Sequence, residues 1–158
     1  MKRNKVLPWV AAAVWMAVIF LFSAQTGGNS GNTSGQIVRW FIDMFYKGFA
    51  DIPAAKQAQV LEIIHLLVRK GAHFTEYAVL AMLVANALRT CSLSHSQWWF
   101  IPIALCALYA VTDEIHQYFV PGRACRFLDM CIDTAGAACG TAVFMLLMLI
   151  KKRASYKH

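Results

Sequence analysis

The stretch VTDEIHQYFVPGRACRFLDMCIDTAG, from Val111 to Gly136, places four carboxylates and two arginines between two long apolar runs. Its meaning depends on the solvent around the chain. The 158 residues are 59% hydrophobic and 15% charged, whereas soluble domains average about 45–50% and about 25%. A chain this small cannot bury so much apolar surface in one core. The composition therefore predicts that lipid surrounds most of the protein.

Four apolar segments are long enough to be transmembrane helices. The predicted spans are residues 6–24, 70–89, 98–119 and 130–150. The first follows basic residues, as a secretory signal would. Its apolar run, however, is longer than the usual run of about 7–15 residues, and Phe22 stands where cleavage needs a small residue. We therefore expect an all-α fold: a single membrane domain over residues 1–158, a multi-pass bundle of four transmembrane helices.

The placement of Lys and Arg favours both termini in the cytoplasm. The basic residues on that side crowd directly against the ends of the first and last spans. Basic flanks of this kind are selected by membrane insertion and by anionic headgroups. The net charge of +7 is thus explained by membrane lipids as partners, and no nucleic-acid partner is predicted.

The segment between the first two spans is predicted to carry one or two short amphipathic helices outside the membrane. Gln25–Gln36 has the composition of a flexible linker. The apolar residues that follow recur at helical spacing and are Ile37, Trp40, Phe41, Met44 and Phe45. We expect this helix on the outer membrane surface, with a re-entrant loop as the alternative. Ala54–Lys70 forms a second helix, with a kink at Gly71. Support for a disulfide between Cys125 and Cys131 is weak.

Polar residues in the last three predicted spans fall in the same leaflet. Positions three and four apart share a helix face, and a rise of 1.5 Å per residue gives their depth. The expected rim is Arg69, Lys70, Arg123, Arg126 and Asp129; the middle layer is His73, Gln117 and Asp133; the floor is Glu76, Tyr77, Asp113 and Glu114. A charged residue deep in a span costs roughly 2.5–3.5 kcal/mol. We therefore interpret these layers as one outward-opening polar pocket.

A G-x-x-x-G pattern continues the polar face of the last span. Gly136 and Gly140 would let another helix approach closely. This face is the predicted surface for a homo-oligomer.

Several blocks of the chain resemble the signature of the VanZ-like membrane proteins. They are RKGAHFTEYAVLAML, TDEIHQYFVPGR, DTAGAACG and the FSAQ that ends the first span. The family pattern falls on Ser23, Gln25, Arg69, Lys70, His73, Glu76, Tyr77, Asp113, Glu114, Gln117, Pro121, Gly122, Arg123, Asp129, Asp133 and Gly136. Asp133 departs from the pattern, in which Asn is as readily expected. The resemblance implies a protein of the bacterial inner membrane, and through the founding member a link to teicoplanin resistance, but no reaction.

The leading hypothesis is a pocket that binds or handles an anionic lipid or a lipid-linked cell-wall precursor. Arginines are suited to phosphate because they offer bidentate hydrogen bonds. The predicted ligand-binding residues are Arg69, Lys70, Tyr77, Gln117, Arg123, Arg126, Asp129, Asp133, Ser23 and Gln25. If a bond is transferred or hydrolysed, the general acid and base come from Glu76, Asp113, Glu114 and His73.

Three alternatives remain open from the sequence. His73 and Glu76, with nearby carboxylates, would ligate a divalent ion in a metal-dependent intramembrane hydrolase or transferase. The polar residues would otherwise be structural ion pairs between helices. A transporter is ranked last, because Asn86 is the only polar group in the inner half of the spans. No cofactor is predicted, and whether the protein is an enzyme is left open.

Overall fold

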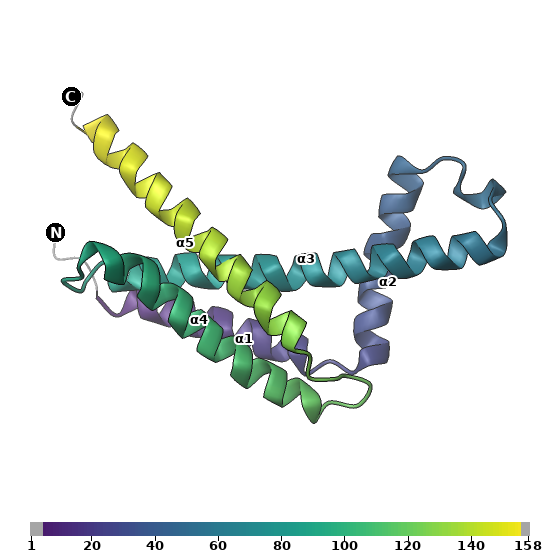
Figure 1. Cartoon of the computed structure of the whole chain (residues 1–158), viewed down its shortest axis with the longest axis horizontal. Coiled ribbons are helices and arrows are strands. Elements are labelled where there is room, and N and C mark those ends of the chain that lie inside the picture. The colour runs from purple at the N-terminus through teal and green to yellow at the C-terminus, as the bar shows by residue number, and fades with distance from the viewer. Residues whose placement is uncertain (1–4, 156–158) are drawn as a thin grey trace.

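The computed structural model describes residues 5–155, and every regular element in that range is helical (Figure 1). The expected all-α fold is confirmed. The elements are α1 (Leu7–Ser23), α2 (Gly27–Phe45), the 3₁₀ turn η1 (Phe49–Asp51), α3 (Ala54–Leu88), α4 (His95–Tyr118) and α5 (Phe127–Ser155).

Helix α3 is the centre of the fold. It packs most extensively against α5 and also contacts α1, α2 and α4. Figure 1 shows α1 and α4 beside one half of α3, α5 crossing it obliquely, and α2 crossing the other half steeply. The buried core draws one alanine or more from each of the four bundled helices, as in Ala12, Ala81, Ala110 and Ala137. Small side chains of this kind allow membrane helices to approach closely.

The contact between α3 and α5 is close because α5 carries glycine where the two backbones meet. Gly136 and Gly140 are buried. A Cβ added to Gly136 would collide with the backbone of Phe74, and one added to Gly140 with that of Ala78. The glycine face therefore receives α3 of the same chain. A homo-oligomer through this face would have to displace α3, which corrects that part of the partner prediction.

Two helices in the described part of the chain, α4 and α5, are long and apolar enough to cross a membrane. α1 is apolar but has 17 residues, and α3 carries charged residues along its 35. Two of the four predicted spans are thus supported by length and composition. Large apolar side chains remain exposed on the outward faces of the bundle, for example Leu21, Phe100, Leu108 and Leu147.

Helix α3 is continuous from Ala54 to Leu88, where two helices with a kink at Gly71 were predicted. Figure 1 shows it running straight. A Cβ at Gly71 would meet nothing within 4 Å, so this glycine lies on an open face. A single glycine costs a helix about 1 kcal/mol, which the long helical stretches on both sides tolerate.

Helix α2 begins at Gly27, so the prediction of a flexible linker over Gln25–Gln36 was wrong for most of that segment. Helix α2 packs against α3. The residues that α2 buries are Val38 and Ile42. The predicted apolar stripe, Ile37, Trp40, Phe41, Met44 and Phe45, is exposed on the outside of the protein.

Candidate functional site

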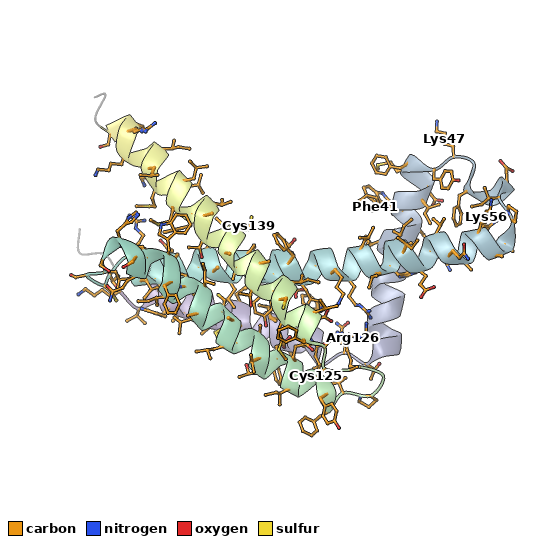
Figure 2. All side chains as sticks on the ribbon, viewed as in Figure 1. Phe41, Lys47, Lys56, Cys125, Arg126 and Cys139 are labelled. Atoms are coloured by element: carbon orange, nitrogen blue, oxygen red, sulfur yellow. The ribbon has the colours of Figure 1, made fainter. Side chains whose placement is uncertain are left out.

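The predicted polar residues gather at one end of the bundle. There α1 and α4 end and α5 begins, while α3 passes through (Figure 1). The α4–α5 loop turns at Pro121-Gly122, where Gly122 has a φ of 76°, a conformation that suits glycine. Figure 2 shows Cys125 and Arg126 of this loop at the same end. Cys125 and Cys131 are both free thiols, so the weakly supported disulfide is not formed.

A buried hydrogen-bonded triad joins α1 to α4. The Ser23 hydroxyl donates to Asp113 Oδ2 at 2.8 Å. The Gln117 amide donates to the same carboxylate oxygen at 3.0 Å and to Ser23 Oγ at 3.1 Å. All three side chains are buried. Asp113 and Ser23 therefore hold two helices together.

The guanidinium of Arg123 closes the end of α1. Its Nε donates to the Gln25 carbonyl at 3.1 Å and Nη2 to the Phe22 carbonyl at 3.2 Å, while Nη1 lies 3.4 Å from Gln117 Oε1. The last carbonyls of a helix have no partner within it, so Arg123 supplies one. Burial lowers the pKa of Arg123, but a guanidinium stays protonated. Gln25 takes part through its backbone carbonyl.

Glu114 is tied to the start of α5. Its Oε2 accepts the backbone N–H of Arg126 at 2.7 Å, one residue before that helix begins. A carboxylate is favourable at this position because the first N–H groups of a helix lack partners and carry positive charge. The side chain of Glu114 is fully buried. It faces the α4–α5 loop rather than the pocket floor that the sequence predicted.

Two polar pairs line the crossing of α3 and α5. Lys70 forms an ion pair with Asp129. One turn further along both helices, His73 Nδ1 lies 3.5 Å from Asp133 Oδ1. Asp133 is fully buried. The predicted rim and middle layer thus meet here as pairs across one helix contact.

Tyr77 lies apart from the other predicted ligand-binding residues. It is fully buried in the apolar core, with its ring 6.1 Å from that of Tyr109. The floor predicted from helix offsets is therefore divided: Tyr77 faces the core and Asp113 faces α1. Glu76 is the floor residue that lines an open cavity.

Two adjoining cavities open among these elements. The larger, about 230 Å³, is lined by Phe22, Ser23, Gln25, Ile37, Val68, Arg69, Ala72, His73, Glu76 and Arg123. The smaller, about 130 Å³, is lined by Arg69, His73, Gln117, Gly122, Arg123, Ala124, Arg126 and Asp129. Arg69, His73 and Arg123 belong to both and separate them. We call these two spaces together the polar site.

Arg69 differs from the other cations of the polar site. Lys70 is paired with Asp129, and Arg123 is bound to carbonyls. Across residues 5–155, no carboxylate forms an ion pair with Arg69. Its charge is thus directed at the two cavities without a counter-ion from the described chain.

The carboxylates and histidines do not converge as ligands of one ion. Among the described residues, no three His, Cys, Asp or Glu side chains form a group with metal-binding geometry. Asp113, Glu114 and Asp133 each face a different neighbour. The geometry therefore gives no support to the metal-dependent alternative.

Some residues that form the polar site could not be identified from the spacing of polar residues in the sequence. Its apolar wall includes Ile37 of α2, together with Val68 and Ala72 of α3. Trp15 donates its indole N–H to the backbone carbonyl of Glu76 at 2.9 Å and so fixes α1 against α3. Backbone carbonyls and small apolar residues carry no local pattern that would have identified them.

The chain was compared with known proteins. The family model described as VanZ/LLP1 matches residues 8–149, which include every predicted site residue. Comparison with curated proteins and with solved structures found no match. The matched region covers nearly all of the chain, and the chain belongs to the VanZ/LLP1 family.

Proposed function

We propose that this protein crosses the bacterial inner membrane four times, through α1, α3, α4 and α5, and binds a phosphate-bearing lipid headgroup in the polar site. The ligand class is an anionic lipid or a lipid-linked cell-envelope molecule. The observation that carries the proposal is Arg69. This arginine lines both cavities and has no ion-pair partner in residues 5–155.

The four-span topology is supported by the surfaces and lengths of the helices. α4 and α5 meet the requirement for a span directly. α3 has 35 residues and a length of about 52 Å at 1.5 Å per residue, well beyond the about 30 Å of a hydrocarbon core. α1 packs against α3 and α4 and exposes large apolar side chains, including Val14 and Leu21. We propose that both termini lie in the cytoplasm and that the polar site lies in the outer leaflet.

The charge balance of the polar site supports an anionic ligand. Most of its carboxylates are engaged: Asp113 by Ser23 and Gln117, Glu114 by a backbone N–H, and Asp129 by Lys70. Arginine binds phosphate with parallel hydrogen bonds. Arg69 is therefore available to a phosphate, with Arg123 beside it in both cavities.

The size and walls of the larger cavity suit a headgroup better than a whole lipid. Its volume of about 230 Å³ is below the roughly 300–1,000 Å³ of sites that enclose a drug-sized ligand. Phe22, Ile37 and Val68 form an apolar wall on its α1, α2 and α3 sides. A lipid tail would leave along this wall into the membrane.

Any reaction on the bound molecule would use Glu76 and His73, the carboxylate and imidazole side chains that line the larger cavity. Binding or modifying a lipid-linked wall precursor would alter sensitivity to teicoplanin-type glycopeptides. This is the phenotype to which the family resemblance points.

Native mass spectrometry of protein extracted in a mild detergent tests the proposal. Wild type should carry one phosphate-bearing lipid more than Arg69→Ala. Arg39→Ala removes an exposed arginine on α2 and should match wild type. Equal lipid occupancy in wild type and Arg69→Ala would overturn the binding site. The mass of the lost adduct would identify the ligand class.

A further inference from the structure

A second cavity lies at the opposite end of the bundle. Figure 1 shows α5 separating from the other helices toward its C-terminal end. The space it leaves next to the end of α3 and the start of α4 is a groove of about 770 Å³. That volume is within the range of pockets that enclose small-molecule ligands, roughly 300–1,000 Å³. We call it the basic groove.

The basic groove combines cationic and apolar walls. Arg89, Lys151 and Lys152 line it together with Trp98, Phe144 and Met145. Phe144 is buried, whereas Trp98 and Met145 are half-buried, so the apolar wall is set back from the surface. A phospholipid has a charged phosphate and apolar acyl chains. The basic side chains of the groove suit the phosphate, and its apolar wall suits an acyl chain.

The sequence provides no side-chain carboxylate at this end of the protein. Residues 1–42, 77–112 and 134–158 contain no Asp and no Glu. These ranges hold the start of α1, the α3–α4 turn and most of α5. Lys151 and Lys152 of the basic groove therefore have no acidic side chain at this end to balance them, unlike Lys70 at the polar site, which pairs with Asp129. An anionic headgroup would supply the counter-charge of these two lysines.

We infer that the basic groove binds an anionic phospholipid, with the phosphate at Lys151 and Lys152 and an acyl chain against Trp98 and Phe144. This site is separate from the polar site and lies in the other leaflet of the proposed topology. It stands independently of the polar-site ligand, since no residue lines both.

Trp98 provides a reporter that the polar site lacks. The purified protein in a zwitterionic detergent is titrated with phosphatidylglycerol carrying brominated acyl chains, and tryptophan fluorescence is recorded. Brominated phosphatidylcholine serves as the zwitterionic comparison. We expect saturable quenching by the anionic lipid at concentrations where phosphatidylcholine quenches little. Trp98→Phe should remove this quenching component.

The headgroup contacts are tested by Lys151→Gln/Lys152→Gln. We expect the half-saturating lipid concentration to rise about tenfold or more, from the loss of two charges near the phosphate. The matched control is Arg39→Gln/Lys47→Gln, which removes two exposed cations from α2 and the turn after it, and it should leave the titration unchanged. The Trp98→Phe comparison separates this groove from the polar site, which Trp98 does not line.

Several results would overturn the inference. They are equal quenching by the two lipids, an unchanged titration in the double lysine variant, and an equal loss in the two double variants, which would indicate general surface charge. Displacement of the brominated lipid by millimolar glycerol phosphate would show a site for free phosphate instead. Shielding of Trp98 in a lipid-free dimer would show that a second copy fills the groove.

Discussion

Arg69 and Arg123 face the same cavities but have different surroundings. Arg123 satisfies two carbonyls at the end of α1 and contacts Gln117, so much of its hydrogen-bonding capacity is used within the protein. Arg69 is exposed and has no ion pair in residues 5–155. The sequence pattern gave both the same role at a cationic rim. Their surroundings give the two arginines different roles: Arg123 stabilises the fold, and Arg69 is available to a ligand.

This difference predicts opposite stability effects for two similar substitutions. Arg123→Ala should lower the free energy of unfolding by about 2 kcal/mol, because two carbonyls at the end of α1 lose a charged donor. Arg69→Ala should leave the stability of the lipid-free protein unchanged. Thermal unfolding in detergent, followed by circular dichroism, makes the comparison. An equal drop in both variants would mean that Arg69 is also structural.

Lysine replacement gives the control for geometry. Arg123→Lys keeps the charge, but a lysine ammonium lacks the planar set of donors with which arginine reaches two carbonyls and an amide oxygen. It should therefore resemble Arg123→Ala more than wild type in the same melting experiment.

At the scale of elements, the α3–α5 crossing is the tightest contact of the fold. Gly136 and Gly140 bring α5 against the backbone of α3, and the pairs Lys70–Asp129 and His73–Asp133 lie along the same crossing. The glycines and the polar pairs thus depend on one helix packing. A change in helix spacing would separate the pairs and alter the cavities lined by His73.

Replacing two glycines on these helices by alanine should change the stability of the protein in opposite directions. Gly140→Ala places a methyl group against the backbone of Ala78 and should destabilise the protein by about 1–3 kcal/mol. Gly71→Ala adds a methyl on an open face of α3 and should stabilise it by up to about 1 kcal/mol. Thermal unfolding of the two variants beside wild type measures both effects. Tolerance of Gly140→Ala would show that α5 sits further from α3.

At the scale of the whole molecule, the charges divide the protein into two unlike ends. All eight acidic residues fall between Asp43 and Asp133, and the polar site contains paired carboxylates and cations. The end with the α3–α4 turn and the last turns of α5 carries cations and no acidic side chain. In the proposed topology this basic end faces the cytoplasm, as the bias of Lys and Arg in membrane proteins favours.

Two native cysteines at opposite ends can test this orientation. Cys91 lies in the α3–α4 turn and Cys125 in the α4–α5 loop, and both are exposed free thiols. In variants that keep one of them and replace the other cysteines by serine, a membrane-impermeant maleimide should label Cys125 in intact cells. Cys91 should react only after the membrane is permeabilised. Labelling of Cys91 in intact cells would reverse the assignment.

Local patterns explain what could be predicted. Apolar runs identified the segments that form α1, α4 and α5, because a segment surrounded by lipid or by other helices consists mostly of apolar residues. An offset of four residues correctly placed Asp129 and Asp133 on one face of the last helix, where each meets a partner on α3. On α3 the offsets grouped His73 with Arg69, whereas the structure pairs Asp129 with Lys70. Helix α4 begins at His95, three residues before the predicted span, where Ser94 and Gln97 form a capping box.

By itself, the sequence determined the all-α class, the family through motifs spread along the chain, and the grouping of the polar residues at one end of the bundle. The tertiary structure alone decided that α3 runs through Gly71 and that α2 is helical from Gly27. It also decided that Tyr77 faces the core, that Arg123 caps α1 and that Arg69 has no ion pair in residues 5–155. The physical reason is that periodicity fixes which face a residue occupies, whereas its partners lie on other helices. Those partners are set only when the helices pack.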